Sequence, residues 1–93
     1  MGLNSFEADL ISIFLKSKKK YLRLSSRLKE HHFRNKTLRW SYKVLQAYYA
    51  KYAKIPTIKV YKEELLKTSF DSKKKKQYYS TIKKLFARKP KTS

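Results

Sequence analysis

Lysine and arginine are the residues of this sequence whose number and spacing indicate a chemical role, namely contact with phosphate groups. The chain has 25 of them against six acidic residues, which gives a net charge of +19. So large a charge opposes folding unless a polyanion relieves it, and each cation near a phosphate releases condensed counterions. We therefore expect a nucleic acid as the partner. The predicted phosphate contacts are Lys18, Lys19, Lys20, Arg23, Arg27, Arg34, Lys36, Arg39, Lys43, Lys73, Lys74, Lys75 and Lys76.

Two lysine runs in the sequence differ in what they indicate. The run at 73–76 lies at the expected start of a helix, where the helix dipole disfavours cations, so helix stability alone does not explain it. The run at 16–20 follows the expected end of a helix, where cations are stabilising. Either run can also be a solvated surface that keeps the protein in solution. The run at 73–76 is therefore the stronger indication of phosphate contact.

Aromatic residues near these cations could stack on unpaired bases. Trp40 falls beside lysines on a helical wheel, which favours a stacking role. Val44 and Ala47 follow Trp40 at helical spacing, however, and this pattern favours packing, the interpretation we prefer. Tyr21 and Tyr48 are further candidates for stacking. The tyrosines expected at the rim of the core, with hydroxyls reaching water, are Tyr42, Tyr49, Tyr52, Tyr61, Tyr78 and Tyr79.

Catalytic and metal-binding patterns are missing from the sequence. There is no cysteine, and the single glycine, Gly2, leaves no Gly-x-x-x-x-Gly-Lys-Ser/Thr phosphate loop. His31 and His32 do not make a metal site by themselves and are interpreted as capping or surface residues. Glu63 and Glu64 are neighbours on an expected helix, so their carboxylates do not face each other. We therefore expect no catalytic activity, no cofactor and no metal.

The scarcity of helix-breaking residues predicts an all-α fold. Between residues 3 and 89 the sequence has one such residue, Pro56, which forces the residue before it away from helical dihedrals. We expect a small single-domain bundle of about five helices over residues 1–88, followed by a basic tail at 89–93. The longest apolar run is far shorter than the roughly 20 residues of a membrane span. The sequence is therefore interpreted as a cytoplasmic protein without a membrane partner.

Capping residues and the spacing of apolar residues predict where the individual helices lie. Side chains that can accept hydrogen bonds at a helix start are Asn4, Asn35, Thr57 and Asp71. A weaker, shorter helix is predicted from Tyr21, Leu24 and Leu28, with His31 and His32 near its end. The predicted core faces are Phe6, Leu10, Ile13 and Phe14 in the first helix, Leu38, Tyr42, Leu45, Tyr49 and Tyr52 in the central helix, Ile58, Tyr61 and Leu65 in the fourth, and Tyr78, Ile82, Leu85 and Phe86 in the fifth.

The middle of the chain is similar to a known family. The matching segments are His32-Phe33, Leu38-Arg39, Ser41-Tyr42, Leu45, Tyr48-Tyr49 and Ile55-Pro56-Thr57-Ile58. They resemble the N-terminal domain of DnaB-type replicative helicases, and the T-even phage form in particular. The first helix, with Glu7, Leu10, Ile11 and Leu15, is also similar to the opening helix of that family. The resemblance spans most of residues 5–86, and its most specific positions are Phe33, Arg39, Tyr42, Tyr49 and Pro56.

This resemblance implies a collar domain of DNA replication in a bacterial host cell. A domain of that kind self-associates, contacts a primase or a helicase loader, and performs no chemistry itself. The sequence departs from the family at His32, which replaces an acidic residue, and in its charge of +19, which indicates direct contact with DNA. The motor domain and the helical hairpin used for pairing are absent from these residues, so self-association is expected to be weak or lost.

Three hypotheses follow from these observations. The leading one is a noncatalytic module that binds nucleic acid, DNA rather than RNA, in phage-like replication. The second is an adaptor whose first and fifth helices dock on a primase or helicase while its lysines meet an acidic protein surface. The third is a basic RNA-binding protein of a ribosome or virion, because phosphate contacts alone do not distinguish the two nucleic acids.

Overall fold

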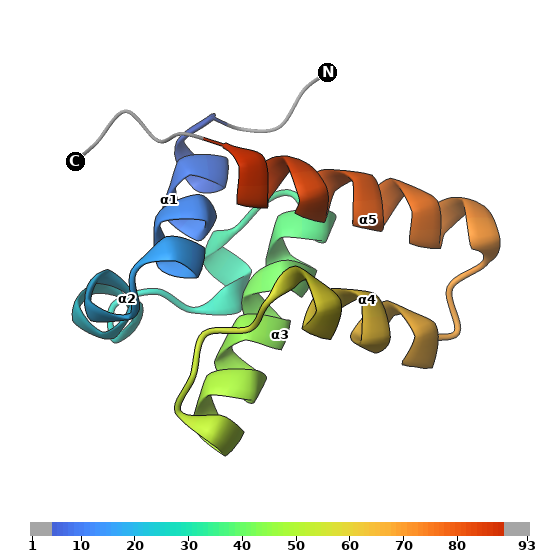
Figure 1. The fold of residues 1–93 in the computed structure, drawn as a ribbon. Helices are drawn as coiled ribbons and strands as arrows, with labels where there is room; N and C mark the ends of the chain where they lie inside the picture. The colour runs from blue at the N-terminus through green and yellow to red at the C-terminus, as the bar shows by residue number, and fades with distance from the viewer. Residues whose placement is uncertain (1–4, 89–93) are drawn as a thin grey trace.

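The fold is all-α, as the sequence predicts. A computed structural model describes residues 5–88, which form five α-helices and one turn of 3-10 helix and no strand (Figure 1). The elements are α1 (Ser5–Lys16), α2 (Lys18–Ser25), the 3-10 turn Glu30–His32, α3 (Lys36–Tyr52), α4 (Ile58–Lys67) and α5 (Ser72–Ala87). Two predictions, the Asn4 cap and the basic tail at 89–93, lie outside the described residues.

Capping residues explain where two of the helices begin. The Asn35 side chain accepts hydrogen bonds from backbone N–H groups two and three residues further on, at 2.8 and 3.1 Å, and α3 follows directly. The Asp71 side chain accepts one at 2.8 Å from the N–H three residues on, at the start of α5. Thr57 occupies the N-cap of α4 in extended backbone, but its side chain makes no capping hydrogen bond. The predictions for Asn35 and Asp71 are therefore confirmed in full.

The second helix differs from its prediction. It begins at Lys18, with Ser17 between it and the end of α1, and stops at Ser25 instead of continuing through Leu28 towards His31. The cause is Ser17, whose hydroxyl accepts the Lys20 N–H at 3.2 Å and so caps a helix that the lysines themselves begin. Lysines 18–20 therefore lie in the first turn of α2 and do not extend the end of α1. The helix dipole disfavours them there as it disfavours the run at 73–76.

The core forms where α1, α3 and α5 meet, with aromatic rings from several elements in mutual contact. Tyr42 on α3 has its ring centroid 6.0 Å from that of Phe14 on α1 and 4.9 Å from that of Phe33. Figure 1 shows α4 running beside α5, and α2 set apart on the other side of α1. The fully buried large residues are Ile11, Phe14, Phe33, Leu38, Tyr42, Leu45, Pro56, Tyr61, Ile82 and Leu85.

The buried face of α1 is not the predicted one. Phe14 is buried as expected, but Phe6 is 71% exposed, and Leu10 and Ile13 are half-buried. Ala8 and Ile11 take the inward positions instead, because α1 packs against α3 and α5 on that side. Among the described helices, α2 lies against the other apolar side of α1, and a groove opens between the two.

Two tyrosine hydroxyls lie inside the protein, where the sequence predicted contact with water. The Tyr42 hydroxyl donates to the Leu28 carbonyl at 2.9 Å, and the Tyr61 hydroxyl donates to the Ser41 carbonyl at 2.8 Å. Both side chains are completely buried. For Tyr52 the prediction differs in the opposite direction. It was expected on the core face of the central helix, but it is 51% exposed in the last turn of α3.

Tyr61→Phe removes the buried hydrogen bond to Ser41 without changing the packing of the ring. We expect the free energy of unfolding to fall by about 1 kcal/mol, the usual net value of one such bond. Urea denaturation measures the change. Tyr52→Phe is the matched control, since its exposed hydroxyl predicts a change near zero. Equal effects of the two substitutions would contradict the assignment.

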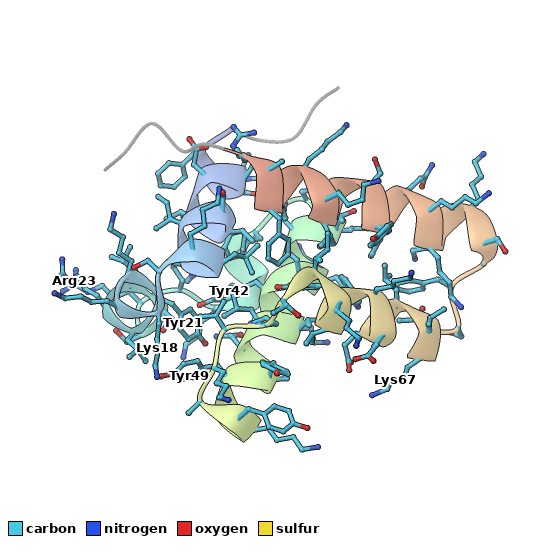
Figure 2. All side chains as sticks on the ribbon, in the orientation of Figure 1. Lys18, Tyr21, Arg23, Tyr42, Tyr49 and Lys67 are labelled. Carbon is cyan, nitrogen blue, oxygen red and sulfur yellow. The ribbon has the colours of Figure 1, made fainter. Side chains whose placement is uncertain are left out.

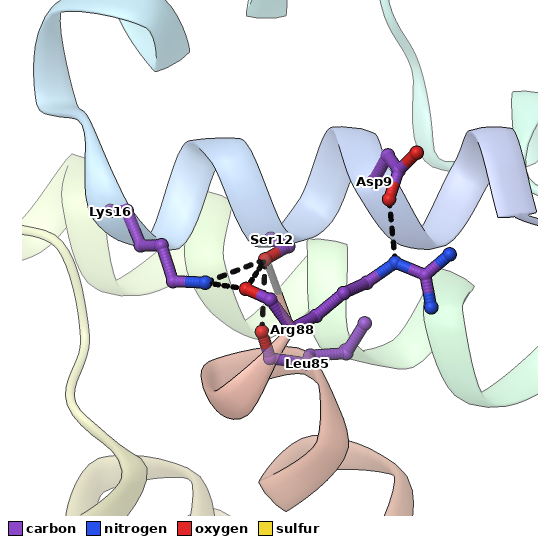
Figure 3. A network of polar contacts seen from close by, with 5 residues as sticks. All are labelled: Asp9, Ser12, Lys16, Leu85 and Arg88. Atoms are coloured by element: carbon purple, nitrogen blue, oxygen red, sulfur yellow. Dashed lines mark hydrogen bonds and ion pairs between the residues drawn. The ribbon is translucent and has the colours of Figure 1, made fainter. Parts of the chain in front are cut away.

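A polar network joins the end of α5 to α1 (Figure 3). The buried Ser12 hydroxyl donates to the Leu85 carbonyl at 3.0 Å. The Lys16 ammonium donates to the Ser12 hydroxyl at 3.1 Å and to the Arg88 carbonyl. The Arg88 guanidinium in turn pairs with the Asp9 carboxylate at 2.6 Å. Lys16 and Arg88 therefore have structural partners, and neither was among the predicted phosphate contacts.

Candidate nucleic-acid interface

The acidic residues of the chain leave most of its cations unneutralised. Asp9 pairs with Arg88, and Glu64 pairs with Lys67 at 3.3 Å, while Asp71 caps α5. These three carboxylates serve the fold. Six carboxylates cannot neutralise 25 cations, so 25 − 6 = 19 positive charges remain in excess whatever ion pairs form.

One basic group lies on α2, where Lys18, Lys19 and Arg23 are exposed and Lys20 is half-buried. Figure 2 shows Arg23 extending outward from the helix, away from the body of the protein. The Lys18 ammonium lies 5.7 Å from the centroid of the Tyr49 ring, a cation–π distance. We call Lys18, Lys19, Lys20 and Arg23 the α2 group.

Tyr21 anchors the α2 group to the core. Its ring centroid lies 5.6 Å from that of Phe14 and 5.1 Å from that of Tyr49, and the residue is only 5% exposed. The idea that Tyr21 stacks on a base is therefore wrong, because its ring is already packed between α1 and α3. What Tyr21 does is fix the position of the neighbouring cations.

A second basic group lies on α3, and we call Lys36, Arg39 and Lys43 the α3 group. All three are exposed, and their spacing of three and four residues places them on one side of the helix. Arg39 has a structural bond as well: its Nε and Nη2 atoms donate to the Phe33 carbonyl at 3.1 and 3.0 Å. A guanidinium has five N–H donors, so Arg39 keeps donors for an external anion.

The corner before α3 is also held by hydrogen bonds to the backbone. The Arg34 backbone N–H donates to the Glu7 carboxylate at 3.2 and 3.3 Å, while the residue itself is exposed. His32 accepts the Lys29 backbone N–H on its Nδ1 atom at 3.0 Å. The capping interpretation of His32 is therefore confirmed. Arg27, in the loop after α2, is exposed as well.

The third basic group is the run at 73–76 in the first turn of α5. Lys73 and Lys76 are exposed, whereas Lys74 and Lys75 are half-buried. The Lys74 ammonium lies 4.2 Å from the centroid of the Phe70 ring, within cation–π range. Lys74 thus has a partner inside the fold.

The predicted contacts do not form one continuous patch. Figure 1 shows α2 at one end of the molecule and the first turn of α5 at the opposite end. The structure brings the members of the α2 group together, and likewise the members of the α3 group. The run at 73–76, by contrast, lies far from the α2 group (Figure 1). A ligand that touches both ends must therefore extend along the molecule, whose longest dimension is 35 Å.

Trp40 packs against neighbouring helices. It is half-buried, and its ring centroid lies 6.0 Å from that of Tyr61 and 5.6 Å from that of Tyr78. The packing interpretation is confirmed, and stacking on a base stays a prediction for its exposed part. Tyr48, the other aromatic candidate, is half-buried beside Tyr52, with centroids 4.7 Å apart.

Alkaline pH is expected to destabilise the fold through its buried tyrosines. Burial, with Tyr21 as a smaller cause, raises the pKa of Tyr42 from 10.0 to about 12, and burial also raises the pKa of Tyr61. The folded state then holds protons that the unfolded state has released, so stability is full below pH 10 and falls as pH rises towards 12. The predicted loss from Tyr42 is up to about 3 kcal/mol.

Urea denaturation at pH 9 to 12 measures this loss, with Tyr42→Phe as the comparison. Lysines lose their charge over the same range in both proteins, so the difference between the two curves isolates the tyrosine. We expect the variant to lose less stability than the parent. Parallel curves would show that the Tyr42 hydroxyl ionises as readily in the fold as in the unfolded chain.

Residues 5–88 contain no group of three or more His, Cys, Asp or Glu side chains placed to hold a metal ion. None of the helices described is both long and apolar enough to cross a membrane. Comparisons of the chain with protein-family models, with curated proteins and with solved structures gave no significant match.

Proposed function

We propose that this chain is a noncatalytic helical module that binds nucleic acid during DNA replication. The observation that carries the proposal is the excess of 19 positive charges, much of it on the exposed faces of helices. A charge of this size opposes folding through self-repulsion and attracts a polyanion. Binding then relieves the repulsion that the free protein carries.

Phosphate contact by the α2 and α3 groups is the proposed mechanism. Helices hold these side chains at fixed spacing, so less conformational freedom is lost on binding than from a flexible tail. Each phosphate neutralised releases counterions from the nucleic acid. Lysine and arginine contacts to the backbone carry no sequence information, so we expect binding without strong sequence preference.

A replicative role is the further part of the proposal, and it comes from the resemblance to DnaB-type N-terminal domains. On this view the module acts on DNA rather than RNA, in the cytoplasm of a bacterial host, near a helicase, primase or loader. Arg39 and Phe33, two positions of the resemblance, are joined by two hydrogen bonds from the guanidinium to the carbonyl in the corner before α3. That contact supports a structural role for both residues.

Fluorescence anisotropy with four labelled oligonucleotides of equal length tests the proposal. Single- and double-stranded forms of DNA and of RNA are titrated at the same salt concentration, and we expect DNA to bind more tightly than RNA. Tighter binding of RNA would favour the RNA-binding hypothesis. No binding to any of the four, together with capture of a replication protein in high salt after nuclease treatment, would favour the adaptor.

A further inference from the structure

A groove between α1 and α2 combines apolar and basic side chains. Its volume is about 330 Å³, and its apolar lining comes from Phe6, Leu10, Ile13 and Leu24. Phe6 is 71% exposed at one wall, although a phenylalanine at the surface gains nothing for the fold. The groove is therefore an apolar site that no other part of residues 5–88 fills.

The charges at the edge of this groove are basic. Lys20 and Arg23 from α2 line it beside the apolar residues. Asp9 lines it too, but its carboxylate is paired with Arg88 at 2.6 Å. The rim available to a ligand therefore carries net positive charge over an apolar floor.

We propose that this groove docks an acidic amphipathic helix of a partner protein. Apolar side chains of that helix enter between α1 and α2, and its carboxylates meet Lys20 and Arg23. Helices bind grooves in this way through apolar residues at i, i+3, i+4 and i+7. The groove lies at the lower end of the size range of ligand pockets, which suits a few side chains.

Charge and composition argue against other occupants. A second copy of this chain carries the same charge of +19, so pairing through a rim that is itself basic is opposed by repulsion. The phosphate groups of a nucleic acid would pair with Lys20 and Arg23 but would leave the apolar lining of the groove without a partner. An acidic amphipathic helix satisfies both the floor and the rim.

The probe for this site is a fluorescein-labelled synthetic peptide with leucines at helical i, i+3, i+4 and i+7 positions and glutamates elsewhere. It is titrated into the full chain and into Phe6→Ser, which removes an exposed wall of the groove and so leaves the fold intact. We expect micromolar binding that weakens about tenfold in Phe6→Ser. Leu22→Ser is the matched control, since Leu22 is also exposed on α2 but does not line the groove.

Several results would overturn the proposal. Binding absent up to about 1 mM peptide would do so. Equal binding of a scrambled peptide would remove the requirement for an apolar face, and equal binding of a version with lysine for glutamate would remove the charge complementarity. Equal losses in Phe6→Ser and Leu22→Ser would place the peptide elsewhere. A dimer seen by sedimentation that disappears in Phe6→Ser would assign the groove to a second copy.

Discussion

Loss of four positive charges from the α2 and α3 groups is expected to lower the affinity for DNA by about a hundredfold or more at low salt. The variant carries Lys19→Gln, Arg23→Gln, Lys36→Gln and Lys43→Gln. All four side chains are exposed, so their replacement leaves the core unchanged. Because each contact contributes close to one unit to the salt dependence, the slope of log affinity against log salt should become shallower by about four. Anisotropy with one labelled DNA at several salt concentrations gives both quantities.

A second variant with the same net charge shows whether position matters. Lys59, Lys62, Lys83 and Lys84 are exposed lysines on α4 and α5 that are not among the predicted contacts. Their replacement by glutamine also takes the charge from +19 to 19 − 4 = +15. We expect a much smaller loss of affinity, because long-range attraction falls only slightly while the direct contacts remain. Equal losses in the two variants would mean that total charge alone determines binding.

Phe14→Ala is expected to cost about 3–5 kcal/mol of the free energy of unfolding. Phe14 is fully buried and contacts both Tyr21 and Tyr42, so its loss leaves a cavity where α1, α2 and α3 meet. A domain of this size has a stability of only about 5–15 kcal/mol, so the variant should be partly unfolded at moderate urea concentrations. Urea denaturation followed by circular dichroism measures the change.

Phe6→Ala is the matched control, since it removes the same side chain from the same helix at an exposed position. Its expected effect is within about 0.5 kcal/mol of zero. Similar costs for the two substitutions would contradict the assignment of α1's buried face to Ala8, Ile11 and Phe14.

The helices that could be predicted from sequence are those with a local signal. Asn35 and Asp71 cap α3 and α5 through side-chain bonds to groups two or three residues away, so nearby sequence is sufficient. The buried face of α1 could not be predicted from local sequence. Its apolar residues form two overlapping stripes, and only the packing of α1 on α3 and α5 determines that Ile11 is buried while Phe6 is exposed.

The candidate site shows the same division between local and tertiary information. Exposure of residues such as Lys36 and Lys43 follows from their position opposite the apolar stripe of α3. The separation of the run at 73–76 from α2 depends on how five helices pack, which no local pattern encodes. The bond from Arg39 to the Phe33 carbonyl likewise needs the corner that joins them.

The dependence of affinity on salt tests most directly whether the cations of this protein bind the phosphates of a nucleic acid. Six to ten phosphate contacts predict a linear decrease of log affinity with log salt, amounting to a loss of about 10³ to 10⁵ between roughly 50 and 200 mM. A steep line of this kind is the expected result for the unmodified chain with duplex or single-stranded DNA. An affinity that stays constant over the same range would contradict the account.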